Sequence, residues 1–115
     1  MIVQERMAVY INSLDTGNGP FLDALQRQAL QDEVPIIRQD MQSFLKVLLA
    51  MHQPKKILEV GTAIGFSALL MADHTSEECQ ITTIEKYEKR IPAAKENFKK
   101  AGRENRITLL EGDAL

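Results

Sequence analysis

The stretch from Lys55 to Ser67, KKILEVGTAIGFS, constrains the fold of this chain more than any other. It opens with a short apolar run, which is typical of a parallel strand buried on both faces. The apolar residues of this run are Ile57, Leu58 and Val60. Gly61 and Gly65 then bracket a tight turn, and the good helix formers that follow predict a helix. A glycine lets the backbone approach a ligand without a Cβ in the way, and a helix that opens here directs free N–H groups at that ligand.

A second strand and an acid follow at the spacing of a nucleotide-binding βαβ unit. The β-branched run QITTI, residues 80–84, predicts the strand, and Glu85 stands at its carboxyl end, 20 residues after Gly65. In such units an acid about 20 residues beyond the turn binds the ribose, because a carboxylate can accept two hydrogen bonds from a vicinal diol. Gly61, Gly65 and Glu85 therefore predict a site for a cofactor that contains adenosine.

The glycine pattern favours S-adenosylmethionine (SAM) over a dinucleotide. Ala63 stands where the dinucleotide fingerprint G-x-G-x-x-G has its second glycine, so the chain reads E-x-G-x-x-x-G from Glu59. That glycine lets the backbone approach a pyrophosphate, which SAM lacks. A third predicted strand, ITLLEGD, ends in Gly112 and Asp113 beside the first two strand ends, where an adenine ring could lie. An NAD-dependent oxidoreductase is the less favoured alternative.

These motifs together resemble a known family. The stretches EVGTAIGFS, IE after the second strand and EGDA after the third look like the SAM-dependent O-methyltransferases of the catechol and caffeoyl-CoA type. The likeness is greatest to the small bacterial members, among them the tRNA 5-hydroxyuridine methyltransferases. It is strong from Val34 to Ala114, and Phe66 stands where tyrosine is more common. The resemblance implies the first half, β-α-β-α-β, of a Rossmann-like class I methyltransferase sheet behind N-terminal helices.

Spacing and resemblance together give a set of candidate cofactor-binding residues. The resemblance implies that Glu59 helps to hold the methionine end of SAM, directly or through the loop, with the hydroxyls of Thr62 and Ser67 nearby. Glu85 is expected at the ribose. The full set is Glu59, Gly61, Thr62, Gly65, Ser67, Glu85, Gly112 and Asp113.

The resemblance also implies a reaction and partners. Methyl transfer from a sulfonium to an oxygen requires an aligned acceptor that loses its proton. In the resembled family Mg²⁺ binds the acceptor's oxygens, and its ligands come from the fourth strand onward, so we assign no catalytic or metal-binding residue here. The expected acceptor is a hydroxyl of tRNA 5-hydroxyuridine or of a small catechol-like phenol, and a homodimer is expected. A non-catalytic cofactor-binding or dimerisation module is the alternative from another class.

The chain divides into a helical segment, 1–54, and an incomplete cofactor-binding α/β domain, 55–115. Apolar spacing predicts helices over 2–14, 20–32 and 39–51 in the first part. The second part is expected to have strands at 56–60, 80–84 and 106–110, with helices at 66–73 and 87–101, where Pro92 makes the first turn uncertain. A strand order of 3-2-1 would leave the first strand as an open edge. We therefore expect an amino-terminal portion of a longer protein, ending just after its third strand.

Charge and cysteine content limit the classes of binding partner and cellular compartment that we expect for this chain. The 115 residues carry a net charge of −2, which gives no overall attraction to DNA or to an anionic membrane. Cys79 is the sole cysteine, which fits a reducing cytoplasm, and no transmembrane segment is predicted. Charge is uneven, however: residues 86–106 contain eight basic and three acidic side chains. A solvated helix face is the default interpretation of this basic segment, and an RNA-backbone contact is the sharper one.

Overall fold

The computed structural model describes residues 5–7, 10 and 17–115. The helix predicted over 2–14 lies largely outside the described residues. Two helices of the N-terminal part, α2 (Pro20–Gln31) and α3 (Gln39–His52), confirm the predicted ones within a residue at each end. Pro20 occupies the first turn of α2, where its fixed φ suits a helix and its missing N–H costs nothing. Residues 34–38 between the two helices form neither helix nor strand, as Pro35 predicts.

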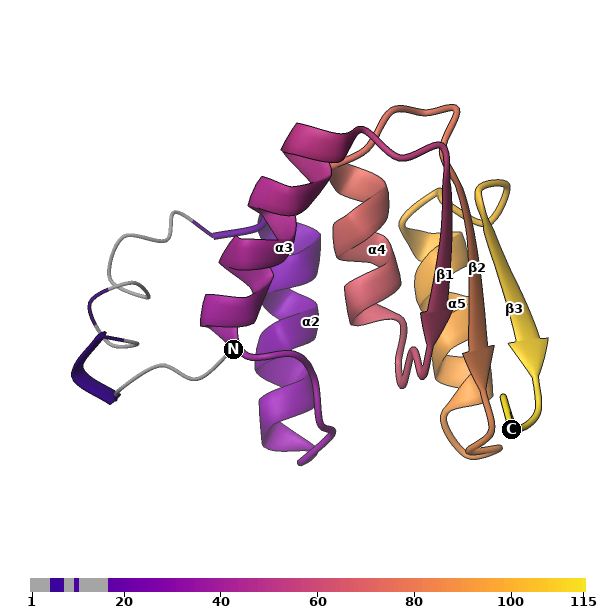
Figure 1. Ribbon diagram of the computed structural model, residues 1–115. Helices are drawn as coiled ribbons and strands as arrows, with labels where there is room; N and C mark the ends of the chain where they lie inside the picture. The colour runs from indigo at the N-terminus through magenta and orange to yellow at the C-terminus, as the bar shows by residue number, and fades with distance from the viewer. Residues whose placement is uncertain (1–4, 8–9, 11–16) are drawn as a thin grey trace.

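From Lys56 onward strands and helices alternate as predicted. The elements are β1 (Lys56–Val60), α4 (Phe66–Asp73), β2 (Gln80–Glu85), α5 (Ile91–Lys100) and β3 (Ile107–Glu111). The strands are parallel in the order β1-β2-β3, so their carboxyl ends meet at one edge of the sheet (Figure 1). Val60 pairs with Ile84, and Glu85 pairs with Glu111, which brings the glycine turn and the acid of β2 side by side. Within the described chain β1 is an edge strand, as expected.

The prediction for α5 was wrong at its start. Residues 87–90 were expected to be helical, whereas the helix begins at Ile91, with Pro92 in its first turn. The backbone N–H of Tyr87 instead donates to a Glu85 carboxylate oxygen at 3.0 Å. A helix that included residues 87–90 would place Pro92 beyond the first turn, where its missing N–H and its ring are costly, so the helix begins where the proline is tolerated.

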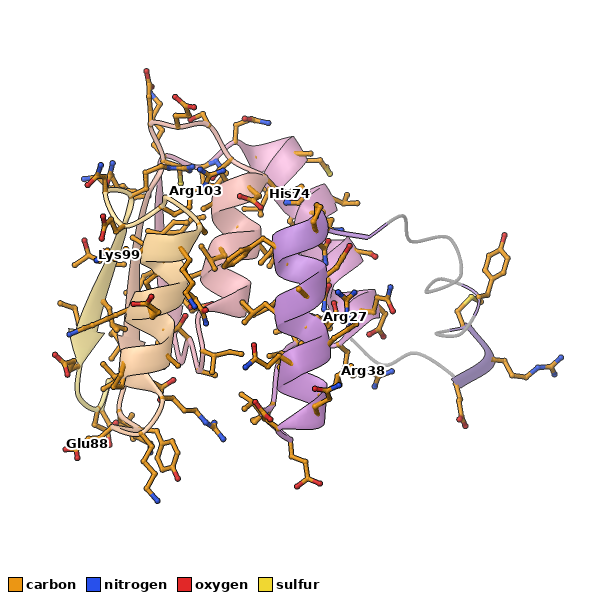
Figure 2. All side chains as sticks on the ribbon, turned by 180° about the vertical axis from the view of Figure 1, so that it is seen from behind. Arg27, Arg38, His74, Glu88, Lys99 and Arg103 are labelled. Carbon is orange, nitrogen blue, oxygen red and sulfur yellow. The ribbon has the colours of Figure 1, made fainter. Side chains whose placement is uncertain are left out.

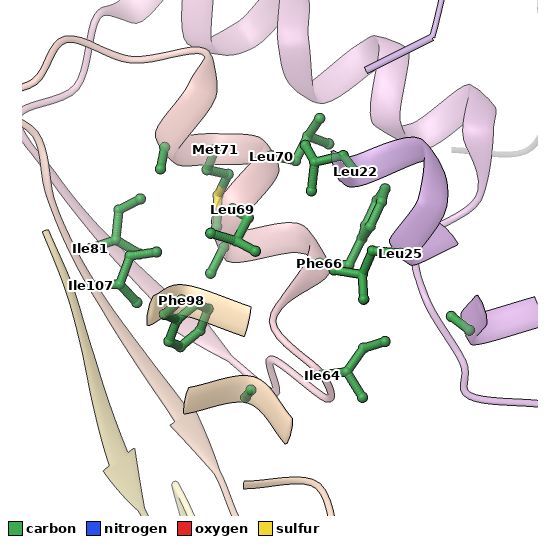
Figure 3. Close-up of a cluster of buried hydrophobic side chains, with 14 of the residues drawn as sticks. Leu22, Leu25, Ile64, Phe66, Leu69, Leu70, Met71, Ile81, Phe98 and Ile107 are labelled. Carbon is green, nitrogen blue, oxygen red and sulfur yellow. The ribbon is translucent and has the colours of Figure 1, made fainter. Parts of the chain in front are cut away.

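The helices gather on one side of the sheet, and the core lies between them and it (Figure 1). Leu69 of α4 and Phe98 of α5 pack with Ile81 and Ile107 of the sheet, and each is less than a tenth exposed (Figure 3). Leu22 and Leu25 extend this cluster along α2 toward Phe66 (Figure 3). Burying large apolar side chains contributes roughly 1.5–3 kcal/mol each, so this layer holds the strand ends in place.

The opposite face of the sheet is open within the described chain, which corrects the prediction that β1 is buried on both faces. Leu58 is 67% exposed and Val60 68%, and Leu110 on β3 is 49% exposed. Successive side chains on a strand point to opposite faces, and all the described helices that contact the sheet lie on the other face. The apolar run of β1 thus places Leu58 and Val60 on an outer face of the sheet that no described residue covers.

Candidate cofactor site at the carboxyl ends of the strands

The loop between β1 and α4 has a backbone path set by three left-handed residues. Gly61 has φ +84°, Ala63 +51° and Gly65 +92°. The N–H of Gly61 donates to the carbonyl of Ile84 at 2.7 Å, which continues the β1–β2 pairing to the start of the turn. The N–H of Gly65 then donates to the carbonyl of Thr62 at 2.8 Å and closes a tight turn just before α4. The predicted strand–turn–helix unit is confirmed.

The two predicted glycines face different surroundings. A Cβ built on Gly61 would meet no atom within 4 Å, so the space beside this Cα is open. A Cβ on Gly65 would lie 2.6 Å from Cε1 of Phe98, so this glycine lets the loop pack against α5. Gly61 is therefore the position where a ligand can reach the backbone, whereas Gly65 serves the packing of the loop.

Glu85 lies at the end of β2, as the spacing predicts, and it holds the loop. Its side chain is only 8% exposed. Oε1 accepts the N–H of Ala63 at 2.7 Å, and Oε2 accepts the N–H of Tyr87 at 3.0 Å. Each carboxylate oxygen can accept a further hydrogen bond. The acid thus fixes two backbone segments and retains acceptor capacity toward a diol.

Glu59 lies beneath the loop and binds two hydroxyl groups. The Ser67 hydroxyl donates to Oε2, and the Thr83 hydroxyl donates to Oε1 at 2.7 Å. Thr83 is fully buried. Because hydrogen bonds to a charged acceptor are the stronger kind, this carboxylate joins β1, β2 and the first turn of α4. The structure thus brings Glu59 and Ser67 together in a hydrogen bond that supports the loop.

Two pockets flank Gly61. The first, of about 280 Å³, lies over the strand ends. It is lined by Val60, Gly61, Ile84, Glu85, Lys86 and the segment 112–115. The second, of about 200 Å³, lies between the glycine loop and the segment before α3. It is lined by Pro35, Ile36, Ile37, Gly61, Thr62, Ala63, Phe66 and Ser67. We call them the strand-end pocket and the loop pocket.

The remaining predicted residues fall around these pockets. Thr62 is 2% exposed, lines the loop pocket, and has a buried Oγ1 without a hydrogen-bond partner among the described residues. Gly112 donates its N–H to the carbonyl of Glu85 at 3.0 Å, which closes the strand-end pocket beside β3. Asp113 is exposed at the rim of this pocket, and its Oδ1 accepts the N–H of Leu115 at 3.0 Å.

Sequence reasoning missed several residues that shape the site. Pro35–Ile37 form a wall of the loop pocket, although the proline indicated only an extended segment. Asn97 of α5 donates to the carbonyl of Ile64 at 2.7 Å and so ties the glycine loop to that helix. An asparagine on a helix gives no local signal of a bond made 33 residues away. Such long-range contacts depend on packing that the sequence pattern does not encode locally.

Two kinds of feature are not found among the described residues. No three acidic, histidine or cysteine side chains among residues 5–7, 10 and 17–115 come close enough to hold a metal ion. Of the helices in these ranges, none has the length and apolar character to cross a membrane.

Comparison with known proteins identifies the family of this strand–turn–helix arrangement. A family model described as O-methyltransferase matches residues 12–115. The chain belongs to the O-methyltransferase family. Among curated relatives of this O-methyltransferase chain, a catechol O-methyltransferase of Mycobacterium tuberculosis is 30% identical over 108 residues, which cover 92% of the chain and 49% of that protein.

Solved methyltransferase structures agree with the fold. A putative caffeoyl-CoA O-methyltransferase from Staphylococcus aureus superposes with a TM-score of 0.85 at 34% identity, covering 93% of this chain and 51% of that one. A methyltransferase from Podospora anserina, solved with bound S-adenosylhomocysteine (SAH), gives a TM-score of 0.82 at 29% identity, covering 99% of this chain and 52% of that one. This chain of the O-methyltransferase family thus spans about half the length of these relatives. The predicted α/β methyltransferase fold is confirmed.

Proposed function

We propose that this chain provides the SAM-binding half of an O-methyltransferase, with the cofactor lying across Gly61. The observation that carries the proposal is the open space at Gly61, a residue that lines both the strand-end pocket and the loop pocket. SAM is an elongated molecule with a nucleoside at one end and an amino acid at the other. Two adjoining pockets on either side of an unobstructed backbone suit such a ligand.

In this proposal the nucleoside occupies the strand-end pocket. Glu85 accepts hydrogen bonds from the ribose hydroxyls with the lone pairs that Ala63 and Tyr87 leave unused. Val60 and Ile84 offer apolar surface to the adenine, and Gly112 and Asp113 border it. The absence of a second glycine at position 63, where Ala63 stands, disfavours a dinucleotide.

The amino-acid end then occupies the loop pocket. Thr62 supplies the one buried hydroxyl of that pocket's described lining that has no partner in the structure. Ser67 and Glu59 hold the loop from below through their own hydrogen bond. We therefore assign Thr62 to direct contact and Glu59 with Ser67 to shaping the loop.

When bound, SAM would supply an electrophilic methyl group on a sulfonium, which passes to the acceptor oxygen as the C–S bond breaks and leaves a thioether. The hydroxyl proton of the acceptor would pass to solvent, so the positive charge of the sulfonium leaves with that proton. The residues of this chain bind and orient the donor, which lowers the entropic part of the barrier. Since no described cluster of side chains fits Mg²⁺, no step is assigned to a metal here.

A small catechol-like phenol is the acceptor we favour. Relatives named as catechol O-methyltransferases cover 92% of the chain in one case and 63% in another, at 30% and 32% identity. A tRNA hydroxyl is the second candidate, and the basic segment 86–106 is the observation that favours it. Figure 2 shows Lys99 and Arg103 at the surface around α5.

Ion pairs inside the described chain reduce the charge available to RNA. Lys95 pairs with Glu111 at 3.2 Å, and Arg103 with Asp73 at 3.1 Å. The guanidinium of Arg106 donates hydrogen bonds to the carbonyls of Ala72, Ser76 and Cys79 and to the hydroxyl of Thr75. The cations of the segment that remain for phosphate contacts are Lys86, Lys89, Arg90, Lys99 and Lys100, with Arg90 lying over the ring of Tyr87. Because these ion pairs leave less positive charge for RNA, we favour tRNA less than a catechol as the acceptor.

Two measurements test the proposed function. Titration calorimetry of the native protein should show binding of S-adenosylhomocysteine (SAH) and no binding of NAD. A tritiated-methyl transfer assay with Mg²⁺, run on the full-length protein, should label a catechol acceptor and leave tRNA unlabelled, whereas the 115-residue chain alone should transfer no methyl group at a useful rate. Labelling of tRNA alone would exchange the two acceptors. Binding of SAH by the full-length protein without transfer to either acceptor would favour a non-catalytic cofactor-binding module, and binding of NAD would point to the oxidoreductase alternative.

A further inference from the structure

A buried glutamine on α3 links three segments of the chain. The side chain of Gln42 is fully buried. Its Nε2 donates to the carbonyl of Ile37 at 3.0 Å, and its Oε1 accepts Nδ2 of Asn18 at 2.9 Å. Asn18 is fixed in turn, because its backbone N–H donates to Oδ1 of Asp23 at 2.9 Å. The amide of Gln42 therefore uses one of its two N–H donors and its oxygen inside the protein.

The bond to Ile37 bears on the cofactor site. Ile37 belongs to the wall of the loop pocket, together with Pro35 and Ile36. This wall belongs to no helix or strand, so no repeating hydrogen-bond ladder holds it. Pro35 has no N–H to contribute. A side-chain bond from the rigid helix α3 to the carbonyl of Ile37 is therefore a direct restraint on the position of the wall.

We infer that Gln42 is a positioning residue that holds the 35–37 segment against the glycine loop and thereby sets the affinity for the amino-acid end of the cofactor. This inference rests on the proposed function. A buried amide whose two ends are both bonded has one orientation, because turning it over would place donor against donor and acceptor against acceptor. Gln42 itself is not among the residues that line the pocket, so its effect on binding is indirect.

A purely structural role for Gln42 predicts something different. If the glutamine served only to join α3 to the segment before α2, its loss would lower stability and weaken all ligands of the site alike. If it positions the wall of the loop pocket, the loss must be selective for ligands that enter that pocket. Two ligands separate these cases: SAH has both a nucleoside and an amino-acid end, whereas 5′-methylthioadenosine keeps the nucleoside and lacks the amino acid.

Three variants of the native protein distinguish the two bonds of Gln42. Gln42→Glu keeps an acceptor for Asn18 and removes the donor to Ile37. Gln42→Met has a similar shape and removes both bonds, and it serves if the buried acid of the first variant prevents folding. Asn18→Ala removes the Asn18 bond alone and is the matched control. Each is measured by calorimetry well below its own melting temperature.

We expect both Gln42 variants to bind SAH more weakly, on the order of tenfold for one lost positioning hydrogen bond. Their affinity for 5′-methylthioadenosine should stay within about twofold of the native value, and Asn18→Ala should bind both ligands as the native protein does. Unchanged SAH affinity in Gln42→Met, or equal losses for the two ligands, would overturn the positioning role. A native protein that binds neither ligand would contradict the proposed function itself.

Discussion

The backbone N–H of Ala63 donates to Oε1 of Glu85 across 2.7 Å, joining the glycine loop after β1 to the acid that ends β2. The other oxygen of Glu85 holds the N–H of Tyr87 at 3.0 Å. The acid that the sequence spacing assigns to a ribose is thus also an anchor for the loop. A mutation at this position should change both the shape of the site and its affinity.

Replacing Glu85 by alanine should weaken binding of SAH by about tenfold to a hundredfold, because charge-assisted hydrogen bonds are worth about 1.5–3 kcal/mol. Stability should fall as well, since two backbone N–H groups lose their acceptor. Calorimetry and thermal melting measure the two effects.

Glu111→Ala is the matched control: this acid pairs with Glu85 in the sheet register, is 58% exposed and bonds only Lys95 among the described side chains. It should cost about 0.5 kcal/mol or less and leave SAH affinity unchanged. Equal effects of both substitutions would remove Glu85 from the site.

Gly65→Ala should destabilise the protein through a steric clash. The new Cβ would lie 2.6 Å from Phe98 Cε1, at a backbone φ of +92°. Overpacking of this kind costs roughly 1–3 kcal/mol, in addition to about 1 kcal/mol for a left-handed alanine. Gly102→Ala is the control for the backbone part, since its φ is +70° and its Cβ would meet nothing within 4 Å. Chemical denaturation should show a clearly larger loss for Gly65→Ala, and equal losses would mean that Phe98 yields without cost.

Glu59→Leu should reduce the free energy of unfolding by more than it reduces the free energy of cofactor binding to the folded protein. The substitution leaves the hydroxyls of Thr83 and Ser67 without their acceptor, and a buried unpaired polar group costs about 1–3 kcal/mol. The double variant Glu59→Leu with Thr83→Val should recover part of the loss, because both partners then become apolar. Urea denaturation measures the recovery. If the double variant is as unstable as the sum of the two single variants, the pair is not coupled.

Charge reversal of Lys99 and Lys100 separates the two candidate acceptors. If the acceptor is tRNA, the KM for tRNA should rise and its salt dependence should weaken, since each lost phosphate contact lowers the salt slope by about one. Methylation of a catechol should be unchanged. Lys55→Glu, an exposed lysine before the amino end of β1, serves as the control. Unchanged tRNA kinetics in a protein that methylates tRNA would reduce the basic segment to a solvated helix face.

Local signals explain what the sequence could predict. The apolar run, the two glycines and the helix formers after them are contiguous, and the helix expected at 66–73 matches α4 residue for residue. Glu85 was found because the length of a βα crossover fixes where the next strand ends. These inferences need only short-range geometry and the periodicities of helix and strand.

Long-range packing explains what the sequence could not predict. The exposure of Leu58 and Val60 depends on which face the helices cover, and apolar character alone does not say this. The wall at Pro35–Ile37 lies across a pocket from the glycine loop, although the two segments are far apart in the sequence.

Binding of SAH to the Gly61→Ala variant tests the central claim most directly. Gly61 has φ +84° and open space where its Cβ would stand, and Gly102→Ala is matched to it in both respects, with φ +70° and equally open space. Both variants should therefore lose similar stability, about 1 kcal/mol for a left-handed alanine. Calorimetry should find native SAH affinity in Gly102→Ala and a loss of at least about tenfold in Gly61→Ala, because only the second methyl group enters the proposed cofactor space. Equal, native-like SAH affinity in the two folded variants would contradict the placement of the cofactor across Gly61.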